Sequence, residues 1–281
     1  MLEDFQVLAF VKTCFIFRKC LIRLFAHVIA ELTRNGGIMF RKALPFFFVT
    51  PLMLFVYLLM LTPVQAGDVG TCSATPDDGT TVFAGDTLSV VQQAILSGTE
   101  GATIKVAGTC RGSGLVIYAN SITLRGGYAS DNWTISNPDV SPTILDANRE
   151  GRVMDVFQHD IVIENLTIMN GLASEGDRGG GIRLFSFEHH QALLRNVVIK
   201  DNETNQIGGG LYSRGMELSM ENVVFSNNSA RASGGGLYYE CNATLVDGEC
   251  AATQIRNSSF VGNQSTEGAS GALYIYTGTV A

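Results

Sequence analysis

The stretch of sequence that decides the fold is Leu218-Ser-Met-Glu-Asn-Val-Val-Phe-Ser-Asn-Asn228, followed by Gly234-Gly-Gly-Leu237. Related copies begin at Ile161, Ala192 and Thr253. Each copy has an Asn at its fifth position, and these residues are Asn165, Asn196, Asn222 and Asn257. The intervals between them are 31, 26 and 35 residues, which suit one turn of a solenoid. We therefore expect the chain to stack one coil per copy.

Apolar residues alternate with other residues inside each copy, at the period of two that is typical of a β-strand. One apolar position holds Ile163, Leu194, Met220 and Ile255, and a second holds Ile168, Ile199, Phe225 and Phe260. A single copy cannot bury these side chains, so neighbouring copies must stack, with strands about 4.8 Å apart. The pattern predicts an all-β fold, a parallel β-helix, over residues 99–281.

A triplet of small residues follows each copy, and its middle residues are Gly180, Gly209, Gly235 and Gly271. Glycine adopts positive φ and lets backbones approach closely, so we predict that these are turn and stacking positions. A phosphate-binding loop is the alternative, but the triplets lack the helix N-terminus and the Lys of such a loop. The repeated Asn fits the same explanation, because Asn tolerates left-handed dihedrals at a bend and stacked amides can hydrogen-bond along a ladder.

Residues 67–98 are predicted to cap the first coil. Asp86 and Thr87 are suited to begin a short helix that Gly98 ends. Its apolar face consists of Leu88, Val91, Ala94 and Ile95. Such a helix would cover the open end of the stack and block edge-to-edge association. The chain stops at Ala281, just past the fourth triplet, so we expect the stack to be incomplete at its C-terminus.

Two further segments precede the cap. Residues 39–66 contain a basic pair, an apolar run from Ala43 to Leu61 and a small-residue site, which predict a signal peptide cleaved after Ala66. The apolar run is also long enough for an uncleaved membrane anchor. Residues 1–38 mix apolar residues with several Lys and Arg. We predict that they are an extension upstream of a true start at Met39, with a basic amphipathic membrane-surface segment as the alternative.

The part after the predicted signal peptide is acidic, with 12 Lys and Arg residues against 23 Asp and Glu residues and thus a net charge of −11. This charge disfavours nucleic acid as a partner. The same part contains Cys72, Cys110, Cys241 and Cys250, an even number that indicates disulfides in an exported chain. The simplest pairing is Cys72 with Cys110 and Cys241 with Cys250, although four cysteines allow three arrangements.

The helix before Thr103-Ile-Lys-Val106 and the Asn-x-x-Phe-x-x-Asn and Gly-Gly-x-Leu patterns resemble bacterial right-handed parallel β-helix repeat proteins of the pectin lyase-like superfamily. The copies around Phe225 and Phe260 are also similar to the repeats of chlamydial polymorphic outer membrane proteins. The resemblance covers residues 86–281. It implies a right-handed coil in a secreted or cell-surface protein, and it implies little about chemistry.

Catalytic motifs of that superfamily are absent from the sequence. The polygalacturonase motifs do not occur, and Ser130 stands where the esterase pattern that begins at Gly126 requires Glu. We therefore predict no catalytic residue, no metal site and no cofactor, with Ca²⁺ as the cofactor if the protein is a lyase. The one dense polar cluster is Glu188, His189 and His190. This cluster could bind a metal or a sugar acid, but the favoured interpretation is that it forms a solvent-exposed face or a protruding loop.

These observations predict a secreted or cell-surface adhesion or spacer module. Its expected partner is a polysaccharide or another cell-surface protein, and its expected contact with a membrane is limited to residues 39–66. A polysaccharide lyase or glycoside hydrolase with divergent or missing catalytic residues is the alternative. The sequence favours the non-enzymatic function without deciding it.

Overall fold

The computed structural model describes residues 71–241 and 253–277. The chain divides into two compact units, residues 1–67 and 68–281, and every described residue belongs to the second. The regular structure of the described residues is one helix, α3 (Ser89–Ser97), and a series of strands. The predicted extension 1–38, the predicted signal peptide 39–66 and Cys250 lie outside the described residues.

The strands, in chain order, are β1 (Cys72–Thr75), β2 (Phe83–Gly85), β3 (Thr103–Arg111), β4 (Leu115–Ile117), β5 (Ile122–Tyr128), β6 (Ile144–Asp146), β7 (Met154–Phe157), β8 (Ile161–Met169), β9 (Ile182–Lys200), β10 (Glu203–Thr204), β11 (Leu211–Glu221), β12 (Val224–Ser226), β13 (Ser229–Ala230), β14 (Leu237–Cys241), β15 (Thr253–Arg256), β16 (Ser259–Val261), β17 (Gln264–Ser265) and β18 (Leu273–Thr277).

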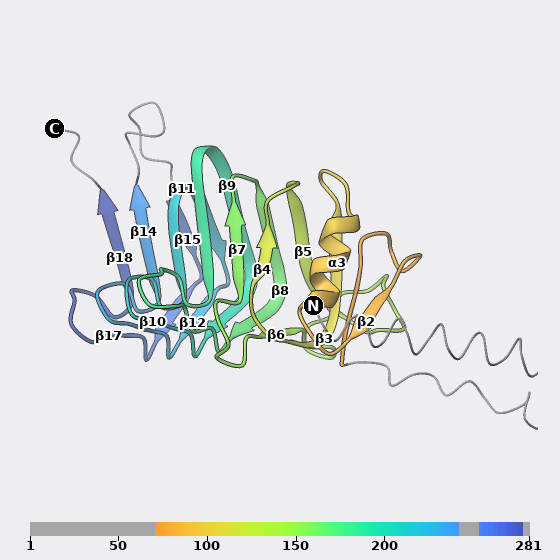
Figure 1. Ribbon diagram of the computed structural model, residues 1–281, viewed down its shortest axis with the longest axis horizontal. Helices are drawn as coiled ribbons and strands as arrows, with labels where there is room; N and C mark the ends of the chain where they lie inside the picture. Colours follow the sequence, from red (N-terminus) through yellow and green to blue (C-terminus); the bar gives the residue numbers. More distant parts are fainter. Residues whose placement is uncertain (1–70, 242–252, 278–281) are drawn as a thin grey trace, which may run out of the picture. The chain divides into compact units, whose positions relative to one another are not determined.

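Successive repeats lie side by side as parallel strands (Figure 1). The main path through the largest sheet is β18-β14-β11-β9-β8-β5-β3-β1-β2. Leu211 stands opposite Ile182 of the preceding repeat and Leu237 of the following one, so each repeat meets the next at the same position. The short strands β10, β13 and β17 form a separate parallel sheet. The expected all-β fold is confirmed, and the copies pair in register with one another.

Both predicted apolar positions form continuous ladders. Ile163, Leu194, Met220 and Ile255 stand opposite one another on neighbouring strands. Ile168, Ile199, Phe225 and Phe260 do the same, and the rings of Phe225 and Phe260 stack with their centroids 4.7 Å apart. Burial of one such side chain contributes about 1.5–3 kcal/mol. The stack is therefore held together chiefly by these interior ladders.

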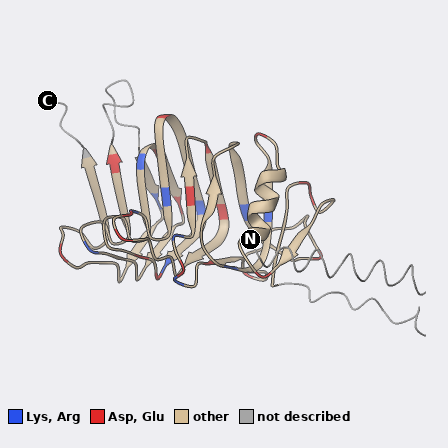
Figure 2. Cartoon of the chain, in the orientation of Figure 1, with Lys and Arg blue, Asp and Glu red and all other residues tan. Residues whose placement is uncertain are grey.

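A ladder of alternating charge runs along the outer surface. Its members are Arg125, Glu164, Arg195, Glu221 and Arg256, which follow one another in register across five strands. Glu164 carboxylate oxygens lie 2.7 Å from Arg125 Nε and 2.9 Å from Arg195 Nη1. Opposite charges at directly opposed positions stabilise a strand pair. Basic and acidic positions therefore alternate from strand to strand (Figure 2).

The glycine triplets divide two roles among their members, and the predicted turn role of the middle glycines is wrong. In the three triplets that consist of glycine alone, the left-handed residue is the first, as Gly208 shows with a φ of +72°. The middle residue is needed for close approach, because a Cβ on Gly209 would lie 2.4 Å from the carbonyl oxygens of Ser229 and Gly235. The same correction applies to Gly180, Gly235 and Gly271.

Two antiparallel strands and the helix lie at the N-terminal end of the stack. β1 pairs antiparallel with β2 and β3, and α3 packs against them with its apolar face buried. The helix and its end at Gly98 agree with the prediction. The prediction that Asp86 caps the helix is wrong, because Asp86 instead accepts hydrogen bonds from the backbone N–H and the hydroxyl of Thr71. The backbone at Thr87 pairs with Arg111 of β3, which draws Asp86 away from the helix start.

A disulfide joins Cys72 of β1 to Cys110 of β3, as the simplest pairing predicts. Cys241 ends β14, and its predicted partner Cys250 lies outside the described residues, so that pairing stays a prediction. No helix within residues 71–241 and 253–277 has the length and apolar character needed to span a bilayer.

Candidate functional site

The four repeated Asn residues are all in the left-handed conformation, with φ between +49° and +58°. Asn165 and Asn196 lie within β8 and β9, while Asn222 and Asn257 lie between consecutive strands. Asn222 donates from Nδ2 to Asn196 Oδ1 over 3.1 Å, and Asn196 donates to Asn165 Oδ1 over 3.0 Å. Asn165 in turn donates to Ser136 Oγ over 2.9 Å. Asn196 and Asn222 are exposed to solvent. We refer to Asn165, Asn196 and Asn222 as the outer ladder.

A second ladder, which the sequence analysis missed, consists of Asn202, Asn228 and Asn263. Asn202 donates from Nδ2 to Asn228 Oδ1 over 2.9 Å, and Asn228 donates to Asn263 Oδ1 over 2.8 Å. Asn202 and Asn228 are 1% and 0% exposed. Each has the same place in its copy, six residues after one of the four repeated Asn residues. That fixed spacing was visible in the repeats, and this inner ladder could have been found from it.

The cluster of Glu188, His189 and His190 lies on an exposed part of β9. Glu188 and His189 are exposed, and His190 Nδ1 lies 3.2 Å from Asp160 Oδ1. The described residues contain no group of three or more His, Cys, Asp or Glu side chains arranged to hold a metal ion. The contact between His190 and Asp160 is one of surface groups, which contribute little to stability. The structure therefore gives the metal interpretation no support.

The candidate functional site is the outer face of β7, β9, β11, β14 and β18. Alternate residues of these strands point outward, so register pairing lines them up from rung to rung. One line consists of Asp155, Arg183, Tyr212, Tyr238 and Tyr274, and a second consists of Phe157, Phe185, Arg214, Glu240 and Tyr276. Aromatic and charged side chains thus gather on one face of the stack.

Three phenylalanines form a patch on this face. Phe157 and Phe185 stack with centroids 5.6 Å apart, and Phe187 meets Phe185 edge to face at 4.8 Å. Phe157 is 37% exposed and Phe187 is 46% exposed. The guanidinium of Arg214 lies 5.8 Å from the centre of the Phe185 ring, in cation–π geometry. Clustered exposed aromatic rings beside an Arg are typical of the energetic centre of a protein interface.

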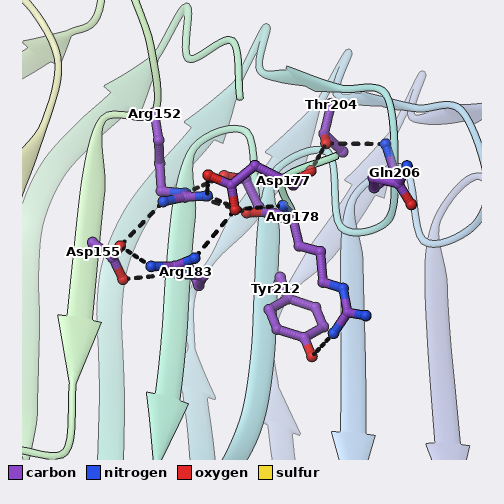
Figure 3. A network of polar contacts seen from close by, with 9 residues as sticks. Arg152, Asp155, Asp177, Arg178, Arg183, Thr204, Gln206 and Tyr212 are labelled. Atoms are coloured by element: carbon purple, nitrogen blue, oxygen red, sulfur yellow. Dashed lines mark hydrogen bonds and ion pairs between the residues drawn. The ribbon is translucent and has the colours of Figure 1, made fainter. Parts of the chain in front are cut away.

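A network of Arg and Asp side chains lies on the same face (Figure 3). Arg152 lies 3.1 Å from Asp155 and 2.6 Å from Asp177. Arg183 also bridges the two carboxylates, with Nε 3.0 Å from Asp155 Oδ1 and Nη1 3.1 Å from Asp177 Oδ1. Asp177 comes from the loop before β9, and Arg152 from the segment before β7. The network therefore ties these loops to the strands.

Tyr212 continues the network toward the next rung. Arg178 donates from Nη1 to the Tyr212 hydroxyl over 2.9 Å, and that hydroxyl donates to Glu240 Oε2 over 2.6 Å. Burial, together with the hydrogen bond to Glu240, raises the pKa of Tyr212, so its hydroxyl remains a donor at neutral pH. The Tyr238 ring packs against the Tyr212 ring with the centroids 5.9 Å apart and the planes tilted by 32°. The side chains beside the phenylalanine patch are thereby held in fixed positions.

The Asp177 carboxylate of the network is poorly suited to acid catalysis. Burial opposes ionisation of Asp177, but the hydrogen bond and charge of Arg152, with contributions from Arg178 and Arg183, outweigh it and lower the pKa of Asp177. Asp155 is also ion-paired to Arg152 and Arg183. A glycosidase acid must instead carry a proton near neutral pH, which requires a raised pKa. The arrangement favours a structural role for both residues.

The sequence analysis did not single out these outward residues. Phe157, Phe185 and Phe187 lie outside the four copies, and the segments between the copies differ in length. Strand register places Phe157 opposite Phe185. The available signals were the alternation of apolar and exposed positions in Ile182 to Phe187 and the spacing of Phe157 and Phe185, which is close to the repeat interval.

Comparison with known proteins finds one similarity. Residues 222–240 match the family model described as Chlamydia polymorphic membrane protein (Chlamydia_PMP) repeat. The matched segment begins at the outer-ladder Asn222, includes the inner-ladder Asn228 and the triplet 234–236, and ends at Glu240. No curated protein and no solved structure matches the chain. The match supports a repeat protein with repeats similar to those of the polymorphic membrane proteins.

Proposed function

We propose that this chain is a cell-surface repeat protein whose residues 99–281 wind as a right-handed parallel β-helix and present a protein-binding face. Parallel crossover connections within one sheet are right-handed in about 98% of cases, which supports the handedness. The similarity of residues 222–240 to a polymorphic membrane protein repeat supports the location. The resemblance to pectin lyase-like proteins and the export signal at 39–66 belong to this proposal.

The observation that carries the binding function is the phenylalanine patch. Phe157 and Phe187 expose apolar rings although the interior ladders offer buried positions to aromatic residues such as Phe225. Apolar rings in water are costly unless a partner covers them. Arg214 beside the patch is held by Glu240, with Nε 3.2 Å from Oε1, so its position is fixed before binding. We take another cell-surface protein as the partner.

A pair of variants tests the patch. The double variant Phe157→Ala, Phe187→Ala removes the two exposed rings, while Tyr276→Ala removes an aromatic ring of equal exposure, 46%, from β18 on the same face. Beads coated with the full chain are allowed to bind purified matrix and cell-surface proteins and a panel of glycans. We expect a protein ligand to lose at least about tenfold in affinity with the double variant and to be unaffected by Tyr276→Ala.

Other outcomes would contradict the proposal. Wild-type beads that bind no protein would favour a spacer role. Product release from pectin, alginate or polygalacturonate, with or without Ca²⁺, would establish a lyase or hydrolase instead. Equal loss of binding in the double variant and in Tyr276→Ala would show that the patch has no special part in recognition.

A further inference from the structure

A groove lies along the outer ladder. Its volume is about 320 Å³. One wall comes from the loop between β5 and β6, with Pro138 and Pro142, and the floor includes Asn165, Asn196 and Asn222 from three successive repeats. Thr167 and Val198 also line it. None of the residues of the phenylalanine patch lines the groove, so the two surfaces are separate.

The floor offers regularly spaced donors and acceptors. A primary amide has two N–H donors and two acceptor lone pairs. The bonds along the outer ladder use one N–H of each amide, from Asn222 to Asn196, from Asn196 to Asn165 and from Asn165 to Ser136. Asn196 and Asn222 are exposed. Each rung therefore presents further donor and acceptor capacity to a ligand, about 4.8 Å from the next.

The lining selects against strongly charged ligands. Among its residues, Asp139 is the one ionisable side chain, and it is exposed at the rim. An anion such as a uronate would be repelled by Asp139 and would find no lining Arg or Lys. Pro138, Pro142 and Val198 add apolar surface against which C–H groups can pack. A ligand with both hydroxyl groups and C–H faces, and without charge, fits these walls.

We propose that the groove binds a neutral, extended oligosaccharide along the outer ladder. A β-1,4-linked pyranose chain advances by nearly one rung per sugar. Neighbouring sugars are turned over relative to each other, but both edges of each sugar carry hydroxyl groups, so every rung meets a hydroxyl-bearing edge. An extended peptide advances by about 3.3 Å per residue and repeats its side-chain direction every second residue, out of step with rungs about 4.8 Å apart. The hydroxyl groups of each sugar donate to Asn Oδ1 and accept from Nδ2.

The test uses variants that remove the amides and keep the backbone. Glycine adopts the left-handed conformation of Asn196 and Asn222, so the double variant Asn196→Gly, Asn222→Gly deletes the groove amides with little strain. Asn257→Gly is the matched control, because Asn257 has the same conformation and does not line the groove. Titration calorimetry with the full chain uses cellohexaose and xylohexaose, together with hexagalacturonate and a Ser/Thr-rich decapeptide.

We expect a neutral hexasaccharide to bind and its affinity to fall by about tenfold or more in the double variant, with Asn257→Gly close to wild type. A second variant, Val198→Arg, fills the groove without touching an Asn bend and should also abolish binding, which covers the case of a poorly folded double variant. Several results would overturn the proposal: no binding of either neutral sugar at millimolar concentration, tighter binding of hexagalacturonate or the peptide, or equal losses in the double variant and in Asn257→Gly.

Discussion

The outer and inner Asn ladders use the same residue at the same repeat interval, but they differ in burial and in hydrogen bonding. The outer ladder of Asn165, Asn196 and Asn222 is exposed at Asn196 and Asn222, and one hydrogen bond joins the side-chain amides of neighbouring rungs. In the inner ladder, Asn228 is fully buried and makes four side-chain hydrogen bonds, to Asn202 N and Nδ2, Ile199 O and Asn263 Oδ1. Repetition in a sequence marks a position without revealing whether it is structural.

Burial accounts for the difference. An exposed amide exchanges hydrogen bonds with water when its partner is lost, whereas a buried amide leaves its partners unsatisfied at full cost. The inner amides also lie against the third glycine of each triplet, where a Cβ on Gly210 would be 3.0 Å from Asn228 Cγ. The inner ladder and the glycines therefore depend on each other, and the outer ladder is free to contact a ligand.

The largest effect is expected from Asn228→Ala. This change deletes four hydrogen bonds and leaves the backbone N–H of Asn202 without its acceptor in a buried place. We expect a loss of about 3–5 kcal/mol in the free energy of unfolding, measured by urea denaturation. Asn222→Ala in the same repeat is the control. Equal losses in the two variants would remove the distinction between the ladders.

A smaller effect is expected from Gly210→Ala. The new methyl group would lie 2.6 Å from the Gly236 carbonyl oxygen and would press on Asn228. We expect a loss of about 2–3 kcal/mol from overpacking, seen as a lower midpoint of thermal unfolding. Gly101→Ala is the comparison, since its Cβ meets nothing within 4 Å and its φ of +76° costs about 1 kcal/mol. If Gly101→Ala is the worse variant, close packing against the inner ladder is not the reason for these glycines.

Substitutions of Asn222 separate conformation from hydrogen bonding in the outer ladder. Asn222→Ala forces a non-glycine residue without a polar side chain into a φ of +53° and should cost about 1–2 kcal/mol. Asn222→Gly keeps the conformation and should cost less than about 1 kcal/mol. Urea denaturation of both variants checks the order. Equal losses in the two variants would mean that the side-chain hydrogen bond, rather than the backbone conformation, fixes this position.

The smallest effect is expected on the pH dependence of stability. Neither Asn ladder titrates, so this dependence must come from other residues. The lowered pKa of Asp177 means that its contribution is present above the unfolded pKa of about 3.9 and is lost as the pH falls through the folded value. Asp177 is partly exposed, so solvent screening limits the contribution to less than about 1 kcal/mol. Asp177→Asn should therefore reduce the difference in stability between pH 7 and pH 3. An unchanged difference would place the acid sensitivity elsewhere.

Much of the fold could be predicted from the repeats. The interior ladders through Ile163 and Phe225, the helix that ends at Gly98 and the disulfide between Cys72 and Cys110 all agree with the sequence pattern. The errors are local and have a common cause. Asp86 bonds to Thr71 and the middle glycines meet carbonyl groups of other rungs, so both depend on partners that are distant in sequence.

The candidate sites were harder to predict from the sequence than the fold. The phenylalanine patch forms because strand register aligns Phe157 with Phe185, and the groove forms because the loop with Pro138 and Pro142 lies beside three ladder residues. The three phenylalanines and the loop with Pro138 and Pro142 lie outside the four copies. The repeated residues could be recognised in the sequence. The positions of the loops, which convert a regular surface into a site, could not be predicted from it.

The sequence by itself determined that this chain stacks, which residues point inward and where it bends, because side-chain alternation and the tolerance of Asn and Gly for left-handed dihedrals act over a few residues. Only the tertiary structure decided which Asn ladder is buried, which glycine of each triplet turns and which outward side chains meet. Those outcomes depend on contacts between residues some thirty positions apart, and only the packing of one rung on the next brings them together.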